Sequence, residues 1–201
     1  MSDKISSIDK NLSIENVAEN NLEYYDITQP PFTICGFPWF KQGEKFRRLP
    51  STVLEKINND GVKYLSQYSA GGMLKFKTDS SNISLKAELF TEEDMSHMPR
   101  SGSSGFDLYI GYGRNKIFIK IAMPERGKKI ITTDLIRDFK KEMREWTINF
   151  PLYNGVNNLT IGLDKYSTLE KAPPFKVKNP VLFYGSSITQ GGCASRPGNS
   201  Y

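Results

Sequence analysis

The feature of this sequence best suited to chemistry is a serine in a tight turn that follows an apolar run. Residues 181–184 are all apolar, and Gly185-Ser186-Ser187-Ile188 follows them directly. A continuous apolar run is typical of a strand buried on both faces, and glycine allows the chain to bend sharply after it. Enzymes of the α/β class present a nucleophile in this way, because the serine hydroxyl then projects beyond the sheet edge, near free N–H groups at the start of the next helix.

Two related motifs do not match this turn. Thr189 occupies the place of the last glycine in the usual Gly-x-Ser-x-Gly nucleophile elbow. No Gly-Lys-Ser/Thr follows, which excludes a phosphate-binding loop of the P-loop type. Taken by itself, the local pattern therefore leaves two interpretations open for Ser187, a nucleophile and an ordinary turn serine.

A polar loop at residues 91–105 holds two further candidates. His97 is the only histidine of the chain, and Arg100 is a loop cation that could bind an anionic or sugar substrate, although a solvated side chain is the simpler interpretation of each. His97 could replace a catalytic base only if its imidazole reached hydrogen-bond distance of the nucleophile. Asp107, just after the loop, is interpreted as a structural carboxylate, with Arg100 or Arg126 as its ion-pair partner.

Aromatic residues offer a possible binding surface of a different kind. Core packing is the default interpretation, and a platform that stacks on sugar rings is the alternative. The residues concerned are Trp39, Phe40, Trp146, Tyr153 and Tyr166.

Composition narrows the class of protein. The 201 residues carry 27 Lys and Arg against 22 Asp and Glu, but the two signs are interspersed and no nucleic-acid-reading motif is present, so we expect no nucleic-acid partner. No apolar run approaches the ~20 residues of a membrane-spanning helix and no leader-type segment opens the chain, so we expect no membrane partner and a cytoplasmic location. Cys35 and Cys193 lack metal-like spacing and suit reduced thiols, and with one histidine we expect no metal and no organic cofactor.

The elements that must position these residues follow a period of two. Apolar residues at every second place predict strands, and the two around the turn Asp79-Ser80-Ser81-Asn82 are predicted to form a hairpin. We interpret 134–145 as turn plus strand, although its charges also permit a helix. The predicted strands lie at 73–78, 83–89, 106–110, 116–121, 143–150 and 158–163. Many short strands separated by turns predict a mainly β fold of the β-sandwich or jelly-roll kind.

The chain divides into four predicted segments. Residues 1–23 are polar and are expected to form a flexible arm. Residues 24–166 form the sandwich, and 167–180 form a proline-rich linker. Residues 181–201 then begin an α/β unit with one strand and a turn.

Several separated runs resemble one enzyme family. Gly185-Ser186-Ser187-Ile188 resembles the first block of the SGNH (GDSL-type) hydrolases, and Gly105-Phe106-Asp107-Leu108-Tyr109 resembles the Gly-x-Asp-Leu-Tyr signature of the β-sandwich domain that precedes one branch of them. Further runs that resemble this branch are His97–Arg100, Phe150–Val156 and Gly191–Gly198. The resemblance implies that Ser187 is the nucleophile and that its own backbone N–H is the first oxyanion donor. It also implies that the loop of His97 can lie over Ser187, so that His97 is a candidate substrate-binding residue together with Arg100.

The resemblance also implies what this chain lacks. Family members use a Gly and an Asn from later blocks as further oxyanion donors, and an Asp-x-x-His block near the C-terminus that supplies the base; because all of these follow the first block, the resemblance implies that they would lie after Tyr201. We therefore expect the N-terminal portion of a serine ester hydrolase acting on a small acylated substrate, with carbohydrate esters as one candidate, and about 150 further residues in cis, an ordinary domain. The chain alone is expected to be inactive, with residues 180–201 poorly ordered or loosely docked on the sandwich. The alternative is a free-standing carbohydrate- or ligand-binding sandwich in which the last residues are a vestige.

Overall fold

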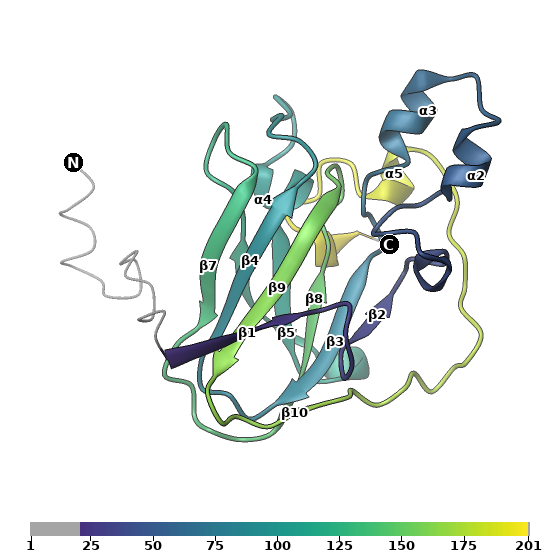
Figure 1. Cartoon of the computed structure of the whole chain (residues 1–201). Helices are drawn as coiled ribbons and strands as arrows, with labels where there is room; N and C mark the ends of the chain where they lie inside the picture. The colour runs from purple at the N-terminus through teal and green to yellow at the C-terminus, as the bar shows by residue number, and fades with distance from the viewer. Residues whose placement is uncertain (1–20, 201) are drawn as a thin grey trace, which may run out of the picture.

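The computed structural model describes residues 21–200, and two antiparallel sheets in it enclose one apolar core (Figure 1). The first sheet contains, in spatial order, β1 (Leu22–Asp26), β9 (Val156–Asp164), β4 (Ile83–Leu89) and β7 (Ile130–Ile136). The second contains β10 (Leu169–Glu170), β3 (Met73–Thr78), β8 (Arg144–Asn149), β5 (Phe106–Ile110) and β6 (Ile117–Ala122), with β2 (Thr33–Cys35) also beside β3. The predicted mainly β sandwich is confirmed.

The boundaries at the two ends of the sandwich differ from those expected. Most of the predicted arm, residues 1–20, lies outside the described residues, but β1 begins at Leu22 and pairs with β9. The predicted linker begins with β10, which pairs with β3. Beyond it, Lys75 Nζ donates to the carbonyl oxygen of Pro173 at 3.0 Å. The first part of the linker is therefore held against the second sheet.

The predicted hairpin of residues 73–89 is wrong. β3 pairs with β8 in the second sheet, whereas β4 pairs with β7 and β9 in the first. Both strands bury apolar side chains in the same core, but they face each other across it and do not lie edge to edge. Alternation of apolar residues fixes which face of a strand is buried and not which strand lies beside it. Between β7 and β8 the chain forms an irregular turn, so the interpretation of 134–145 as turn plus strand is confirmed.

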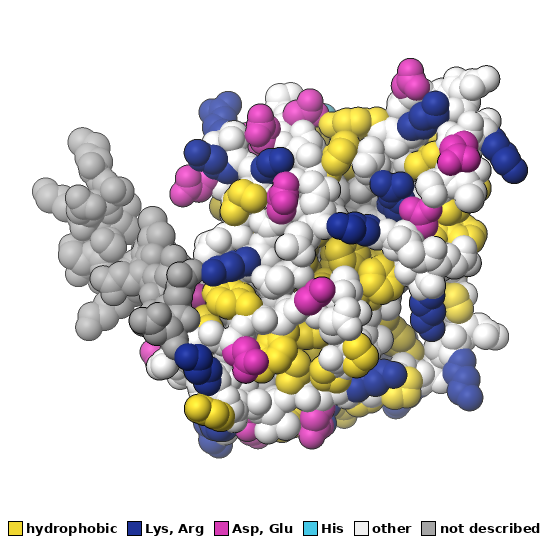
Figure 2. Space-filling model, viewed as in Figure 1, with side chains coloured by type: hydrophobic (Ala, Val, Ile, Leu, Met, Phe, Trp, Pro, Cys, Tyr) yellow, Lys and Arg dark blue, Asp and Glu magenta, His cyan; other side chains and the backbone are white. Residues whose placement is uncertain are grey.

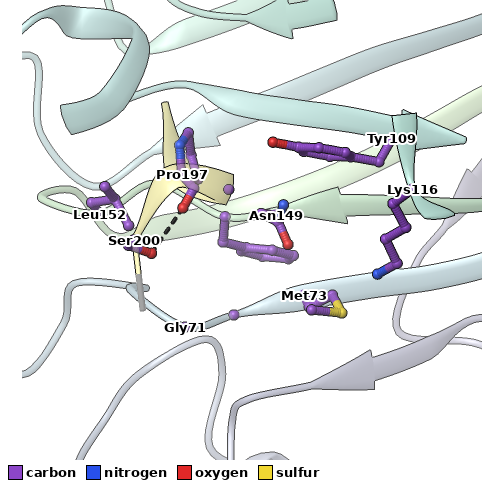
Figure 3. Close-up of a pocket in the computed structure, with 11 residues that line it drawn as sticks. Gly71, Met73, Tyr109, Lys116, Asn149, Leu152, Pro197 and Ser200 are labelled. Carbon is purple, nitrogen blue, oxygen red and sulfur yellow. Dashed lines mark hydrogen bonds between the residues drawn. The ribbon is translucent and has the colours of Figure 1, made fainter. Parts of the chain in front are cut away.

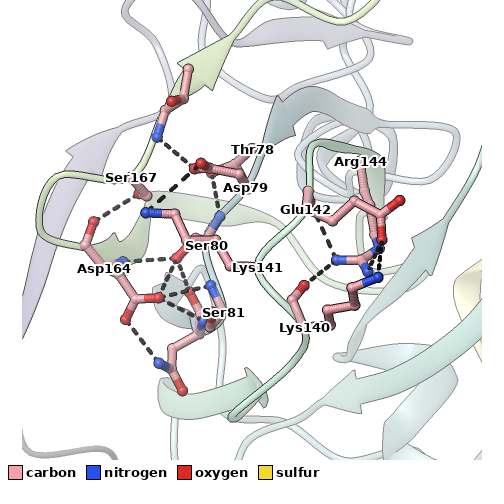
Figure 4. Close-up of polar contacts among 12 residues, drawn as sticks. Thr78, Asp79, Ser80, Ser81, Lys140, Lys141, Glu142, Arg144, Asp164 and Ser167 are labelled. Atoms are coloured by element: carbon pink, nitrogen blue, oxygen red, sulfur yellow. Dashed lines mark hydrogen bonds and ion pairs between the residues drawn. The ribbon is translucent and has the colours of Figure 1, made fainter.

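The turn that links β3 to β4 is held by one carboxylate (Figure 4). Asp164, the last residue of β9, accepts hydrogen bonds from the backbone N–H groups of Ser81 and Asn82 at 2.8 and 3.0 Å. It also accepts from Ser80 Oγ at 3.0 Å and from Asn82 Nδ2 at 2.8 Å. Asp164 thus fixes the crossover from the second sheet to the first.

The core is filled by alternate residues of the strands. Phe106 and Leu108 of β5 and Trp146 and Ile148 of β8 are fully buried within it. Asp107 lies between the two core residues of β5, so its side chain points to the outer face of the second sheet. It is nevertheless 0% exposed. Another part of the chain must therefore cover the outer face at this point.

The aromatic residues considered as a sugar platform do not form one surface. Trp146 lies in the core and Phe40 packs against it, as the default interpretation predicts. The Trp39 indole donates to the carbonyl oxygen of Arg48 at 3.1 Å. Tyr166 is 96% exposed.

The helices within residues 21–200 are all short and lie outside the sandwich (Figure 1). They are η3 (Phe40–Gln42), α2 (Ser51–Leu54), α3 (Asp60–Leu65), α4 (Arg100–Ser103), η4 (Gly113–Asn115), α5 (Ser187–Gln190) and η5 (Pro197–Asn199). From β10 the chain runs back along the outside of the sandwich, so α5 reaches the end where α2 and α3 lie (Figure 1).

Residues 181–200 fall into two parts with different environments. The strand expected at 181–184 is not formed: these residues have no ladder partner, and Leu182 is 87% exposed. The backbone N–H and C=O groups of a strand need a neighbouring strand as hydrogen-bond partner, and none of the described strands pairs with residues 181–184. Residues 185–200, which we call the C-terminal segment, are instead docked on the sandwich, as the contacts below show.

Candidate active site

Ser187 is the first residue of α5 and follows a tight bend. Ser186 caps the helix, because its hydroxyl oxygen accepts from the N–H of Ile188 at 3.4 Å. A Cβ at Gly185 would lie 2.3 Å from Thr189 Oγ1, so any larger residue there would have to displace the Thr189 side chain. Gly191 ends the helix with φ of 94°, a left-handed conformation that glycine adopts without strain. The predicted strand–turn–helix pattern is thus present in its turn and helix.

The reactive groups of Ser187 are open. Its side chain is exposed, and within residues 21–200 neither its hydroxyl nor its backbone N–H has a hydrogen-bond partner. Only the carbonyl oxygen is engaged, by the N–H of Gly192 at 2.7 Å and the hydroxyl of Tyr153 at 3.1 Å. A free hydroxyl beside a free N–H is an arrangement that can attack an acyl carbonyl and hold the resulting oxyanion.

Helix α5 is fixed by side chains from far along the sequence. Gln190 Nε2 donates to the carbonyl oxygen of Leu152 at 2.8 Å. Arg48 Nη1 donates to Gln190 Oε1 at 3.2 Å, and its other terminal nitrogen donates to the carbonyl oxygen of Leu65. Burial lowers the pKa of the Arg48 guanidinium, but an arginine stays charged at neutral pH. Sequence reasoning missed Arg48 and Gln190, because neither belongs to a motif that marks it.

Tyr153 also contacts α5, through the hydrogen bond to Ser187, and the sequence did not predict this contact. Its ring is one of a row of aromatic side chains, 6.2 Å from the ring of Tyr68 between centroids. Burial raises the pKa of the Tyr153 phenol, and nearby Cys193 raises it further, so the hydroxyl stays protonated and donates to Ser187 at neutral pH. Sequence reasoning treated Tyr153 only as a core or sugar-stacking aromatic.

The other end of the C-terminal segment covers Asp107. Asp107 accepts from the N–H of Gly198 at 2.7 Å and from Asn149 Nδ2 at 2.8 Å. Its ion-pair partner is Arg196, whose Nε lies 3.9 Å away and donates to the Tyr109 hydroxyl at 3.0 Å. Burial raises the pKa of the Asp107 carboxyl, while the Gly198 N–H, Asn149 and Arg196 act in the opposite direction.

The partner predicted for Asp107 was therefore wrong, although its structural role was right. Arg100 instead pairs with Asp94, at 2.8 Å from Nε to Oδ1, and donates to the carbonyl oxygen of Pro124 at 3.2 Å. Arg126 lies 3.7 Å from the same Asp94. Both arginines therefore contact Asp94 in the loop at 91–105, and among the described contacts neither binds Asp107.

The predicted substrate-binding residues lie near the C-terminal segment without touching Ser187. The carbonyl oxygen of His97 accepts from Cys193 Sγ at 3.5 Å, and the exposed imidazole has no partner within residues 21–200. Arg100 is held in the ion pair with Asp94. The described residues thus bring no base within hydrogen-bond distance of the Ser187 hydroxyl.

A cavity of about 360 Å³ opens beside the last residues of the segment (Figure 3). Tyr109, Lys116, Asn149, Pro197 and Ser200 are among the residues that line it, and Ser187 is not. The cavity belongs to the docking site of the C-terminal segment and not to the nucleophile turn.

Within residues 21–200, no group of three or more His, Cys, Asp or Glu side chains is placed to hold a metal ion. No helix in that part of the chain has the length and apolar character needed to cross a membrane. Cys35 and Cys193 are both free thiols, as expected. Lys and Arg side chains are interspersed with Asp and Glu on the face shown in Figure 2.

The family model for the GxDLY N-terminus of SGNH-hydrolase-type esterases matches residues 22–169. This chain belongs to that family. The match spans the whole sandwich, including the run with Asp107 and Tyr109 that holds the C-terminal segment. The resemblance stated from the sequence is therefore confirmed.

Solved structures agree with this membership. A protein from Bacteroides ovatus ATCC 8483, described as a GDSL-like lipase, is 28% identical with a TM-score of 0.74 over 89% of this chain. The salicylyl-acyltransferase SsfX3 from a tetracycline biosynthetic pathway shares the fold at 12% identity, with a TM-score of 0.57 over 80% of this chain. The chain spans 51% of the first of these proteins and 44% of the second. No curated protein matches the chain.

Proposed function

We propose that this chain is the N-terminal portion of a serine ester hydrolase in which Ser187 is the nucleophile. The observation that carries the proposal is the turn at Ser187, where a free hydroxyl and a free N–H lie on a helix that the family's sandwich domain holds in place. The substrate is a small acylated molecule, for which family membership is the support.

The reaction requires groups beyond those described. Ser187 Oγ would attack the acyl carbonyl, its proton would pass to a base, and the alcohol would leave before water releases the acyl group. The Ser187 N–H would donate to the oxyanion formed on the way. The described residues offer no base, so the proposal assigns it to an Asp-x-x-His block in a hydrolase segment encoded after Tyr201. A serine with an ordinary pKa is a poor nucleophile without such a base.

The test compares the 201-residue chain with the product of the whole reading frame that encodes it. We expect the full product to hydrolyse p-nitrophenyl acetate and the 201-residue chain to remain at the background rate. Ser187→Ala should lower kcat by at least about a thousandfold, as loss of a nucleophile does.

The tandem serines supply a matched control. Ser186→Ala removes the neighbouring hydroxyl and one capping hydrogen bond, which is worth about 1 kcal/mol, so about a fivefold effect is expected. A full product whose activity survives Ser187→Ala would overturn the nucleophile. A full product without activity on any acyl ester would overturn the hydrolase and favour a binding module.

A further inference from the structure

We propose that Asp107 and Gly198 form a positioning contact for Ser187, so that the sandwich signature serves catalysis by fixing the nucleophile turn. This inference rests on the proposed function, but the contact itself does not. It assigns a purpose to Asp107, which takes part in no chemical step.

Asp107 is placed where a carboxylate would normally meet solvent. It points to the outer face of the second sheet, yet it is 0% exposed because Arg196 and Gly198 cover it. A buried carboxylate is costly unless it is paired and hydrogen-bonded. Asn149, Gly198 and Arg196 supply that compensation together. The cost would be unnecessary on a free-standing sandwich, whose outer face needs no buried charge.

The scaffold under this contact is rigid. β5 pairs with β6 on one side and with β8 on the other, so Asp107 stands on an interior strand of its sheet. Asn149, the last residue of β8, is the direct ladder neighbour of Asp107. A site built on paired strands holds its position better than one on a loop.

The position of Gly198, on the C-terminal segment, leaves no room for a side chain. A Cβ at Gly198 would lie 2.3 Å from the Tyr109 hydroxyl oxygen, and its three nearest atoms would all belong to Tyr109. A second close approach lies at α4, where a Cβ on Gly102 would lie 2.0 Å from the carbonyl oxygen of Ala194. Arg196 also stacks on the Phe118 ring at 4.4 Å. At Gly198 and at Gly102, the C-terminal segment and the sandwich therefore lie too close together to leave room for a Cβ on the glycine.

The segment transmits this placement to the nucleophile. Gly192 N–H donates to the Ser187 carbonyl oxygen at 2.7 Å, and Ala194 N–H donates to Gly191 at 3.0 Å. Ser101 Oγ donates to the Ser195 carbonyl oxygen at 2.7 Å. Tyr153 and Gln190 hold α5 and Asp107 holds the far end, so the segment that follows Ser187 is anchored to the sandwich at two places.

Three runs of the sandwich that resemble the family all contact the same part of the chain, the C-terminal segment. The run with Asp107 and Tyr109 holds Arg196 and Gly198. The run at 97–100 contacts Cys193 through a backbone carbonyl. The run at 150–156 holds α5 through Leu152 and Tyr153. A sugar-binding surface would give no reason for all three to converge on the C-terminal segment.

The test uses variants on the segment, where a substitution leaves the sandwich core untouched. Gly198→Ala introduces the clash with Tyr109, and Gly61→Ala in α3 makes the same chemical change at a distant site. In the full reading-frame product we expect Gly198→Ala to lower kcat for p-nitrophenyl acetate at least tenfold with KM within twofold, and Gly61→Ala to change neither. Amide hydrogen exchange over 187–200 should rise at least tenfold in Gly198→Ala alone.

A second variant separates positioning from general damage. Because the three atoms nearest to such a Cβ all belong to Tyr109, Gly198→Ala made in a Tyr109→Ala background should cost less than threefold in kcat. Asp107→Asn, which keeps one acceptor and removes the charge, should lie between wild type and Gly198→Ala in both kcat and exchange.

The outcomes that overturn the inference differ from those that overturn the function. An active wild type whose kcat and exchange are unchanged by Gly198→Ala would overturn only the positioning contact. A loss of kcat that Tyr109→Ala does not relieve would do the same. A wild type without esterase activity would overturn the proposed function and with it the catalytic purpose of the contact, while the exchange data would still decide whether Asp107 holds the segment.

Discussion

The crossover turn between the two sheets gives a stability prediction with a worked magnitude. Asp164→Ala removes the acceptor that Ser80, Ser81 and Asn82 share, including two backbone N–H groups of the turn. Hydrogen bonds to a charged acceptor contribute about 1.5–3 kcal/mol each, but they are not additive. Because the site is part-buried and water can replace some of them, we expect the free energy of unfolding to fall by about 3 kcal/mol in total.

Urea unfolding followed by tryptophan fluorescence measures this change, since Trp146 is fully buried in the core. For a chain of this size each kcal/mol shifts Tm by about 2–4 °C, so in thermal unfolding the same loss should lower Tm by about 6–12 °C.

A matched acidic residue serves as the control. Glu142 pairs with Arg144 at 2.7 Å, but its side chain is 56% exposed. Figure 4 draws this pair together with the Asp164 cluster. Exposed pairs contribute little, so Glu142→Ala should cost less than about 1 kcal/mol. Equal effects of the two substitutions, or a loss below about 1 kcal/mol in Asp164→Ala, would refute the reasoning.

Three further predictions concern the docked segment and the thiols. Cys193 is exposed, whereas Cys35 is half-buried and burial raises its thiol pKa, so Ellman's reagent at pH 8 should label Cys193 at least tenfold faster; equal rates would contradict this. Burial raises the pKa of Asp107, so the folded state keeps its proton to higher pH than the unfolded state. Stability relative to Asp107→Asn, measured in urea, should therefore fall as pH rises from about 4 through the raised pKa and then level off, and a rise in that window would refute the shift. Tyr153→Phe removes the hydroxyl that donates to Ser187, a hydrogen bond worth about 1 kcal/mol, so kcat of the full product should drop about fivefold; an unchanged kcat would exclude this role.

Local pattern was sufficient for the type of most elements. Alternation located the strands around Phe76, Leu85 and Trp146, because a half-buried strand must place apolar residues on one face. It could not determine that β3 and β4 face each other across the core, since the same alternation suits both arrangements. No helix was predicted from the sequence at Asp60–Leu65, which has only six residues and begins where the Asn59 side chain accepts from the N–H of Val62.

What the sequence by itself determined about this protein is its class, its family motifs and the candidate serine, all of which lie in short continuous runs. Only the tertiary structure decided what those motifs contact. Gly198 meets Asp107 from 91 residues away, and Arg48 reaches Gln190 from 142 residues away. Such pairings depend on how the chain crosses between sheets and doubles back, so no local spacing encodes them. The partner of a buried charge is therefore set by the fold, whereas the need for a partner can already be read from the strand on which it lies.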